Sequence, residues 1–322
     1  MPHPSITAET YPHKPAIIMG DSGEIVTYRE LDERSNQGAQ LFRTLGLKAG
    51  DHIGMMLENN RQFLEIVWAA QRSGLIFTPI STHLKRSEAA YILENCGARL
   101  FIGSLALADS CEQVLEAAPG QIGHFYMVGG IKPGFESWEE AIDLMPITRI
   151  DDESNGVPML YSSGTTGQPK GVFVPPASSD VNTPHPLVAS LGAAFGFSEE
   201  TVYLSPAPLY HAAPLHYNMM AQYQGGTCVV MERFDPERAL QLIEEHRVTH
   251  SQWVPIMFIR MLKLPEEVRR RYDVSSLQVA IHAAAPCPVE VKDKMIQWWG
   301  EVIYEYYAAS EGIGATIIDS AS

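Results

Sequence analysis

The chain has 322 residues, of which 45% are hydrophobic and 19% are charged, and its formal net charge at pH 7 is −15. This composition is ordinary for a globular protein with a large core. The negative charge disfavours binding to nucleic acid or to an anionic membrane surface, because both attract basic proteins. No apolar run approaches the length that spans a bilayer, and Met1–Ser5 lacks the pattern of a signal peptide. We therefore expect a cytoplasmic protein without a transmembrane segment.

The first third of the chain alternates helical and strand patterns. Apolar residues at helical spacing predict three helices, and short apolar runs between them predict strands. The expected helices span residues 28–45, 63–73 and 85–96, and the expected strands span 52–57, 75–80 and 100–102. This alternation indicates parallel strand pairing with helices on the faces of the sheet.

A less regular stretch, residues 119–155, contains glycine, proline and an acidic run, and we place a subdomain junction there. The expected division is an N-terminal α/β subdomain, 1–150, and a second α/β subdomain, 151–322. The second half resumes the rhythm, and Asp235 followed by Pro236 predicts a helix start. The expected strands there are 228–231, 250–254 and 279–281, and the expected helices end near 246 and span 289–299. The predicted fold class is α/β: layered βαβ subdomains with mainly parallel sheets flanked by helices.

The most informative segment, residues 161–171, reads YSSGTTGQPKG and follows an apolar run, 157–160, that we expect to be a buried strand. Its glycines permit positive-φ turns and close approach of backbone N–H groups to phosphate oxygens. Its hydroxyls add donors, and Lys170 adds a positive charge. The segment predicts a nucleotide-phosphate loop, against the alternative of a Gly/Ser-rich surface turn. It is not a Walker P-loop, because Gln168 and Pro169 separate Gly167 from Lys170.

This segment resembles the phosphate-loop signature of the adenylate-forming superfamily, which includes acyl-CoA synthetases, aryl-CoA ligases, luciferases and peptide-synthetase adenylation domains. Further segments match the family in the same order, and the resemblance covers residues 10–318. They are VTYREL at 26–31, KAGD at 48–51, SPAPLYH at 205–211, HAAAP at 282–286 and YAASE at 307–311.

The resemblance implies the site residues. Lys170, Thr165, Glu311 and His211 would take part in catalysis, with Glu311 and Thr165 at a magnesium ion. The implied nucleotide contacts are Ser162, Ser163, Gly164, Thr165, Thr166, Gly167 and Lys170 in the loop, with Ala283, Ala284, Ala285, Glu305, Tyr306, Tyr307, Ala308 and Ser310 further on. Taken alone, each has a structural alternative, such as a solvated lysine at 170 or core side chains at Tyr307 and His211. Two departures are Ala308 and Ser310, where the family commonly has glycine and threonine.

The resemblance also implies the reaction. A carboxylate attacks the α-phosphate of ATP, with Mg²⁺ bound, to give an acyl-adenylate and pyrophosphate, and coenzyme A then displaces AMP. The side chains expected near the acid are mostly apolar, which favours a hydrophobic carboxylic acid of fatty or bulky type over an amino acid. They include Leu209, Tyr210, Leu215, Tyr217, Met219 and Met220. A phosphotransferase is an alternative, but it would release ADP and not AMP.

Family members continue beyond the position of Ser322 through a ribose-binding segment, a hinge and a mobile C-terminal domain. Because this sequence shows none of these, we expect an acid–CoA ligase that lacks the C-terminal domain and is impaired in the complete reaction. The alternative is a catalytically inactive fragment that binds nucleotide or acyl-adenylate. Surface that such a domain would cover is expected to favour association with other copies.

Overall fold

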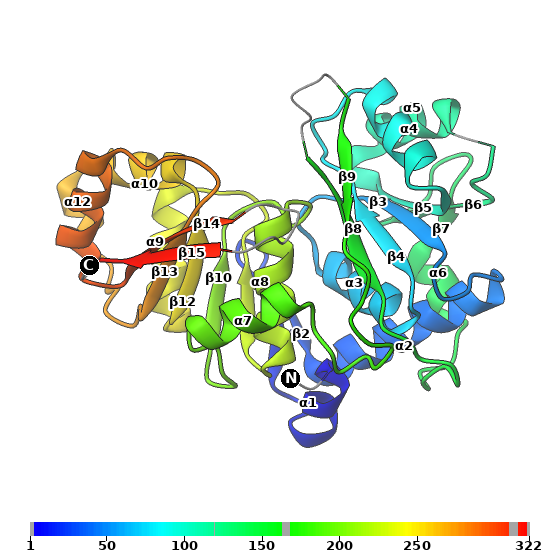
Figure 1. Ribbon diagram of the computed structural model, residues 1–322, viewed down its shortest axis with the longest axis horizontal. Helices are drawn as coiled ribbons and strands as arrows, with labels where there is room; N and C mark the ends of the chain where they lie inside the picture. The colour runs from blue at the N-terminus through cyan, green and yellow to red at the C-terminus, as the bar shows by residue number, and fades with distance from the viewer. Residues whose placement is uncertain (1–2, 119, 163–167, 309–314, 321–322) are drawn as a thin grey trace. The chain divides into compact units, whose positions relative to one another are not determined.

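The computed structural model describes residues 3–118, 120–162, 168–308 and 315–320. The chain forms two compact units, each built on one sheet with helices packed against it (Figure 1). Among the described residues, no helix has the length and apolarity needed to cross a bilayer. Unit 1 comprises Met1–His13, Thr27–Pro186 and Leu209–Ala212, and unit 2 comprises Lys14–Val26, Leu187–Pro208 and Ala213–Ser322.

Unit 1 contains a seven-stranded sheet in the order β7-β6-β5-β3-β4-β8-β9. All its pairs are parallel except β8 with β9, which is antiparallel. The strands are β3 (His52–Met56), β4 (Ile76–Pro79), β5 (Ala98–Ser104), β6 (His124–Val128), β7 (Glu136–Ser137), β8 (Val157–Ser162) and β9 (Lys170–Phe173). The helices are α1 (Pro4–Thr10), α2 (Tyr28–Thr44), α3 (Arg61–Arg72), α4 (Arg86–Asn95), α5 (Ala108–Ala117) and α6 (Trp138–Asp143), with a 3₁₀ turn, η1 (Leu105–Leu107).

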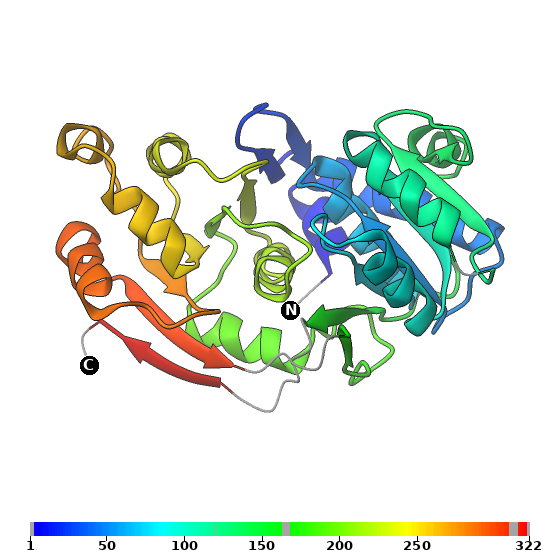
Figure 2. The ribbon, with the colours of Figure 1, turned by 90° about the horizontal axis from the view of Figure 1, so that it is seen from above.

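Unit 2 contains an eight-stranded sheet in the order β15-β14-β13-β12-β10-β11-β1-β2. Its central pairs are parallel, and β15 joins β14 antiparallel at one edge (Figure 2). The strands are β1 (Pro15–Met19), β2 (Ile25–Thr27), β10 (Val202–Ser205), β11 (Thr227–Val230), β12 (His250–Trp253), β13 (Val279–His282), β14 (Ile303–Ala308) and β15 (Ala315–Asp319). The helices are α7 (Pro186–Ala194), α8 (Ala212–Tyr223), α9 (Pro236–His246), α10 (Pro255–Leu262), α11 (Glu266–Arg269) and α12 (Val289–Trp299). Two mainly parallel sheets flanked by helices confirm the predicted fold class.

Local chemistry sets the ends of the helices. Helix α2 begins with a capping box, in which the Glu30 N–H donates to Thr27 Oγ1 at 3.3 Å and the Thr27 N–H donates to Glu30 Oε2 at 2.7 Å. Helix α9 begins at the predicted cap, where Asp235 Oδ1 accepts from the N–H groups of residues 237 and 238. In unit 2 the Trp253 ring packs on Phe258 and Trp299, with centroids 6.1 and 5.5 Å away, and this contact joins the sheet to α10 and α12.

The two units do not divide at residue 150. Strand β8 pairs with β4 through Ile76 and Val157, so residues 151–186 belong to unit 1. A Cβ on Gly156 would lie 2.4 Å from the Leu75 carbonyl oxygen, so only glycine permits this close approach of the two backbone segments. Strand β1 pairs with β11, which places residues 14–26 in unit 2. The stretch 119–155 is not a junction, because it supplies β6, β7 and α6 to the first sheet.

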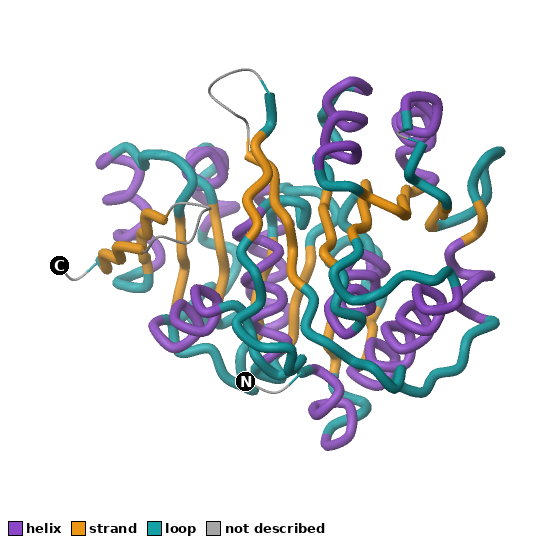
Figure 3. The backbone as a smooth tube through the Cα atoms, turned by 45° about the vertical axis from the view of Figure 1, so that its right-hand side comes forward, coloured by secondary structure: helices purple, strands orange, loops and turns teal. Residues whose placement is uncertain are grey.

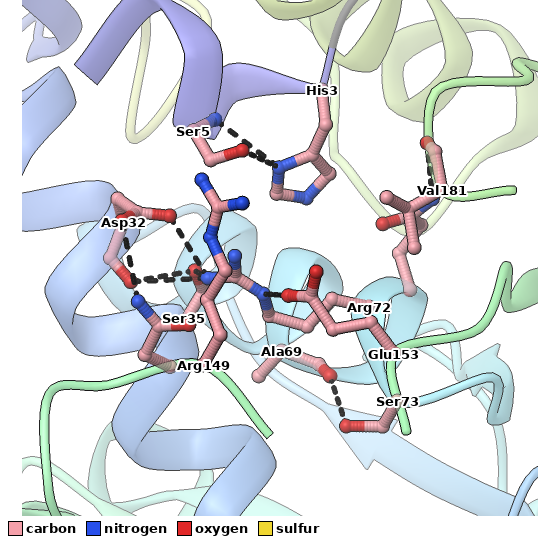
Figure 4. Close-up of polar contacts among 12 residues, drawn as sticks. His3, Ser5, Asp32, Ser35, Ala69, Arg72, Ser73, Arg149, Glu153 and Val181 are labelled. Carbon is pink, nitrogen blue, oxygen red and sulfur yellow. Dashed lines mark hydrogen bonds and ion pairs between the residues drawn. The ribbon is translucent and has the colours of Figure 1, made fainter. Parts of the chain in front are cut away.

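A buried arginine joins three segments of unit 1 (Figure 4). Arg72 is fully buried at the end of α3, and its Nη1 donates to Asp32 Oδ1 at 3.0 Å and to Ser35 Oγ at 2.8 Å in α2. Its Nε donates to Glu153 Oε1 at 2.7 Å. Two carboxylates thus balance a cation that would otherwise be costly to bury. The contact to Glu153 also explains why the segment after residue 150 stays with unit 1.

The imidazole of His3 lies next to this arginine (Figure 4). Its Nδ1 is 3.0 Å from Ser5 Oγ, and its ring packs edge-on against Trp68 with centroids 5.1 Å apart. Burial, followed by the positive charges of Arg72 and Arg149, holds the pKa of His3 well below its usual value. The segment before α1 is therefore held to unit 1 by a neutral histidine.

Candidate functional site

The predicted phosphate loop begins and ends on the two strands of a β-hairpin of unit 1. Strands β8 and β9 lie side by side (Figure 3), and their register places Ser162 directly opposite Lys170. Both residues are exposed. The hairpin therefore holds a hydroxyl and an ammonium group together at the base of the loop. This pairing fits recognition of an anion, because both side chains donate hydrogen bonds and one carries positive charge.

The residues below this pair fix the hairpin to its unit. Tyr161 donates a hydrogen bond from its hydroxyl to Asn95 Oδ1 at 2.5 Å, and burial raises the pKa of this tyrosine. Gly171 faces Tyr161 across the hairpin, and a Cβ there would lie 2.9 Å from the tyrosine ring and 2.4 Å from Met159 Cε. Strand β8 confirms the predicted strand, but Pro158 and Met159 are only partly buried, since the hairpin lies at the edge of the sheet.

Part of the predicted site lies outside the described residues, and the roles assigned to that part stay predictions. Within the described residues, no group of three or more His, Cys, Asp or Glu side chains is placed to hold a metal ion. The residues outside that range are Ser163, Gly164, Thr165, Thr166, Gly167, Ser310 and Glu311.

The second set of predicted residues lies at the carboxyl ends of β13 and β14 in unit 2. The two strands are parallel, and His282 is in register with Glu305. His282 is fully buried, and neither ring nitrogen has a hydrogen-bond partner among the described residues; Nε2 lies 3.9 Å from Glu305 Oε2. Burial lowers the pKa of His282, which favours a neutral ring. Glu305 Oε2 accepts from Lys292 Nζ of α12 at 3.0 Å. A neutral imidazole therefore lies beside a half-buried carboxylate–ammonium pair.

The three alanines that follow β13 form a turn. Ala283 is buried, whereas Ala284 and Ala285 are exposed. Ala284 has φ 74°, in the left-handed region that disfavours residues with a Cβ. Strained backbone of this kind is often found at functional sites. Small side chains on such a turn leave room for a flat ligand, as the resemblance implies.

Alternation along β14 separates the residues predicted there. Glu305 and Tyr307 point to one face of the sheet, and Tyr306 points to the other. The Tyr307 side chain is 79% exposed and free of the core. Tyr306 packs edge-on against Tyr217 with ring centroids 6.2 Å apart, and burial raises its pKa to about 12. Tyr307 is thus the ring on this strand that a ligand can reach, and Ala308 follows it, half-buried, at the strand end.

His211 belongs to a short segment that packs with unit 1. The Leu209 N–H donates to Asn59 Oδ1 at 2.8 Å, which fixes this segment. The His211 ring lies 4.6 Å from that of Tyr210, and the residue is exposed. Desolvation lowers the pKa of His211, and the nearby His83 lowers it further. His211 therefore belongs to unit 1, the unit that also contains Ser162 and Lys170.

The sequence motifs assign no role to two residues of this region, His282, which begins the HAAAP segment, and Lys292. The only signal for His282 was a polar residue that ends an apolar strand directly before the alanines. Lys292 gave no signal, because its contact with Glu305 joins a helix to a strand and cannot be read from local pattern.

A family model described as AMP-binding enzyme matches residues 5–322, so this chain belongs to the AMP-binding enzyme family. The chain is 26% identical to the crotonobetaine/carnitine–CoA ligase of Escherichia fergusonii, over 97% of its length and 61% of that protein. It is 29% identical to the 4-coumarate–CoA ligase CCL1 of Humulus lupulus, over 87% of its length and 51% of that protein. It thus spans between half and about three fifths of the length of these curated relatives.

The fold is similar to that of solved members. The inhibitor-bound N-terminal domain of FACL13 from Mycobacterium tuberculosis superposes with a TM-score of 0.86 at 23% identity, covering 100% of this chain and 79% of that one. The long-chain-fatty-acid–CoA ligase FadD1 from Archaeoglobus fulgidus superposes with a TM-score of 0.84 at 23% identity, covering 96% and 63%. At this level of identity the likeness concerns the fold.

Proposed function

We propose that this chain activates a hydrophobic carboxylic acid with ATP, forming an acyl-adenylate and releasing pyrophosphate, as part of an acid–CoA ligase reaction. The observation that carries the proposal is the pairing of Ser162 with Lys170 at the base of the predicted phosphate loop, in a chain whose family match spans residues 5–322. The relatives named above are CoA ligases, which agrees with coenzyme A as the acceptor.

The proposed roles follow from the chemistry of each side chain. Lys170 and the loop hydroxyls would stabilise negative charge that develops on the phosphates. Tyr307 offers an exposed ring on which a purine can stack. Glu311 and Thr165 would hold Mg²⁺, which neutralises phosphate charge when bound. His211, with a lowered pKa, would be a neutral neighbour of the carboxylic acid.

The proposed acid is hydrophobic because the side chains predicted near it are mostly apolar and buried. Leu209, Leu215, Tyr217 and Met220 are each at most 2% exposed. None of them offers a charge that would bind an α-amino group, so we propose a fatty or aryl acid and not an amino acid.

The test is to incubate the protein with MgATP and a panel of short, long, aryl and sterol acids without coenzyme A, and to detect acyl-AMP by mass spectrometry. We expect acyl-AMP with at least one acid, and AMP, not ADP, on addition of coenzyme A. Lys170→Ala and Glu311→Gln should each lower the rate about tenfold or more, a loss of ~1.4 kcal/mol or more of transition-state stabilisation. Lys48→Ala and Glu301→Gln are matched controls, because both side chains are exposed.

A second candidate function is nucleotide or acyl-adenylate binding without turnover. The relatives whose activity is named are longer than this chain, which covers 51% to 61% of two of them. Calorimetric titration with MgATP separates the two functions. Binding by folded protein with no acyl-AMP across the panel favours the second, and ADP as product would contradict both.

A further inference from the structure

Unit 2 carries a cavity of about 660 Å³ between helices α10, α11 and α12. Its volume is in the range of small-molecule sites. None of the residues that the sequence motifs predict for ATP, magnesium or the acid lines it. Its lining residues are Ile259, Leu262, Lys263, Glu266, Arg269, Arg270, Glu290, Val291, Lys294, Gln297 and Trp298.

The charged side chains of this cavity leave an excess of positive charge. Glu266 Oε1 lies 2.5 Å from Arg270 Nη2, and Glu290 Oε1 lies 2.5 Å from Lys294 Nζ. Each carboxylate of the lining therefore forms an ion pair with a cation four residues further along the chain. The other two cations, Lys263 and Arg269, have no ion-pair partner among the described residues. A local surplus of this kind, on a chain of net charge −15, favours binding of an anion.

Arg269 is positioned by an aromatic ring. Its Cζ lies 5.5 Å from the centroid of Trp298, and its Nε is buried without a hydrogen-bond partner in the described part of the chain. The cation–π contact holds the guanidinium in place while its donors remain unpaired. Planar guanidinium groups match the geometry of carboxylates.

The remaining lining is apolar. Ile259, Leu262 and Val291 contribute aliphatic side chains, and Trp298 contributes an indole ring. Inorganic phosphate would leave this surface uncovered, and a neutral hydrocarbon would leave the cations unpaired. We propose that this cavity is a second ligand site of unit 2, which binds a small organic anion, a carboxylate on an apolar body. The carboxylate accepts hydrogen bonds from Arg269 and Lys263, and the body packs on Trp298.

The test is calorimetric titration of the whole chain with decanoate, without ATP, and in parallel with decanol and inorganic phosphate. We expect decanoate to bind, and decanol and phosphate to bind at least fivefold more weakly. Arg269→Gln and Lys263→Gln should each weaken decanoate binding about fivefold or more, and added salt should weaken it further. Trp298→Phe should weaken decanoate binding less, because a phenyl ring still offers an apolar surface to the hydrocarbon body.

Matched controls locate the bound decanoate. Arg233→Gln changes an exposed arginine outside the cavity and should leave the affinity unchanged. Lys170→Ala should also leave it unchanged, which separates this site from the proposed acyl-adenylate site. Equal binding of decanol, or decanoate binding that survives both Arg269→Gln and Lys263→Gln in folded protein, would overturn the proposal. Absence of decanoate binding would overturn it as well.

Discussion

Two fully buried basic side chains, one in each unit, differ in their hydrogen-bond partners. Arg72 in unit 1 donates to Asp32, Ser35 and Glu153 and has its charge balanced. Neither ring nitrogen of His282, in unit 2, has a hydrogen-bond partner among the described residues, and its Nε2 lies 3.9 Å from Glu305 Oε2.

The difference shows how burial serves two purposes. A paired arginine holds three segments together, and its removal lowers the stability of the fold because two carboxylates lose their cation. The His282 ring packs edge-on against Phe258 with centroids 5.6 Å apart, but its nitrogens gain no hydrogen bond among the described residues, and we propose that they serve a ligand beside the alanine turn. The predictions below test this contrast between a structural and a functional buried base.

The largest expected effect is on stability in unit 1. Arg72→Met keeps the apolar stem of the side chain but leaves Asp32 and Glu153 without a cation, so we expect a loss of about 3–5 kcal/mol of unfolding free energy. Urea titration followed by tryptophan fluorescence measures it. The control is Arg86→Met, whose ion pair with Glu116 is exposed and should be worth less than ~1 kcal/mol. Equal losses in the two variants would show that burial of Arg72 is not what matters.

His282→Phe should show the reverse pattern. A phenyl ring is somewhat larger than imidazole, but it removes two polar atoms that have no partner among the described residues; the two effects oppose each other, so stability should change by less than ~1 kcal/mol. Acyl-adenylate formation should fall about tenfold, equal to ~1.4 kcal/mol. Parallel urea titrations and rate measurements with the best acid of the panel test both parts. A stability loss as large as that of Arg72→Met would show that His282, like Arg72, has a structural role.

The strained turn beside His282 gives a smaller effect on stability. Ala284→Gly removes the Cβ from a residue at φ 74°, and we expect a gain of about 1 kcal/mol. Thermal unfolding of the variant measures it. Ala285→Gly is the matched control, since Ala285 has no positive φ and should gain nothing. If both substitutions destabilise equally, the turn stores no strain.

The smallest effect concerns pH and the neutral histidine next to Arg72. The pKa of His3 is lower in the folded chain than its ordinary value of 6.5, so the unfolded chain binds more protons below that value. The contribution of His3 to stability is full above about pH 6.5 and is lost as pH falls below it. Urea midpoints at pH 7.5 and 5.5 should differ more in the unaltered protein than in His3→Gln. The same difference in both proteins would assign the pH dependence to other histidines.

Local pattern predicted the elements well where caps and periodicity agree. Asp235 with Pro236 gave the start of α9, and apolar spacing gave both ends of α12. The predicted unit boundary at residue 150 differs from the observed division. That division depends on the pairing of β8 with β4 and of β1 with β11, and neither pairing can be predicted from the local sequence.

The candidate site was predictable in so far as it consists of contiguous motifs. The segments around Lys170, Ala284 and Tyr307 were all named from the sequence. What could not be read is the direction of the side chains, such as the opposite faces of Tyr306 and Tyr307 on β14. The partner of Glu305 was also hidden, since Lys292 reaches it from another element.

The pairing of β1 with β11 has a consequence for synthesis of the chain. Ile17 pairs with Cys228, so β1 stays without its partner while roughly 200 residues are translated, which takes ~10–40 s at ordinary rates. The sheet of unit 1 is complete in sequence once β9 has been made. On the ribosome, the sheet of unit 1 can therefore form while β1, the first strand of the chain, still lacks β11. We expect a chaperone to be needed most at this unpaired strand.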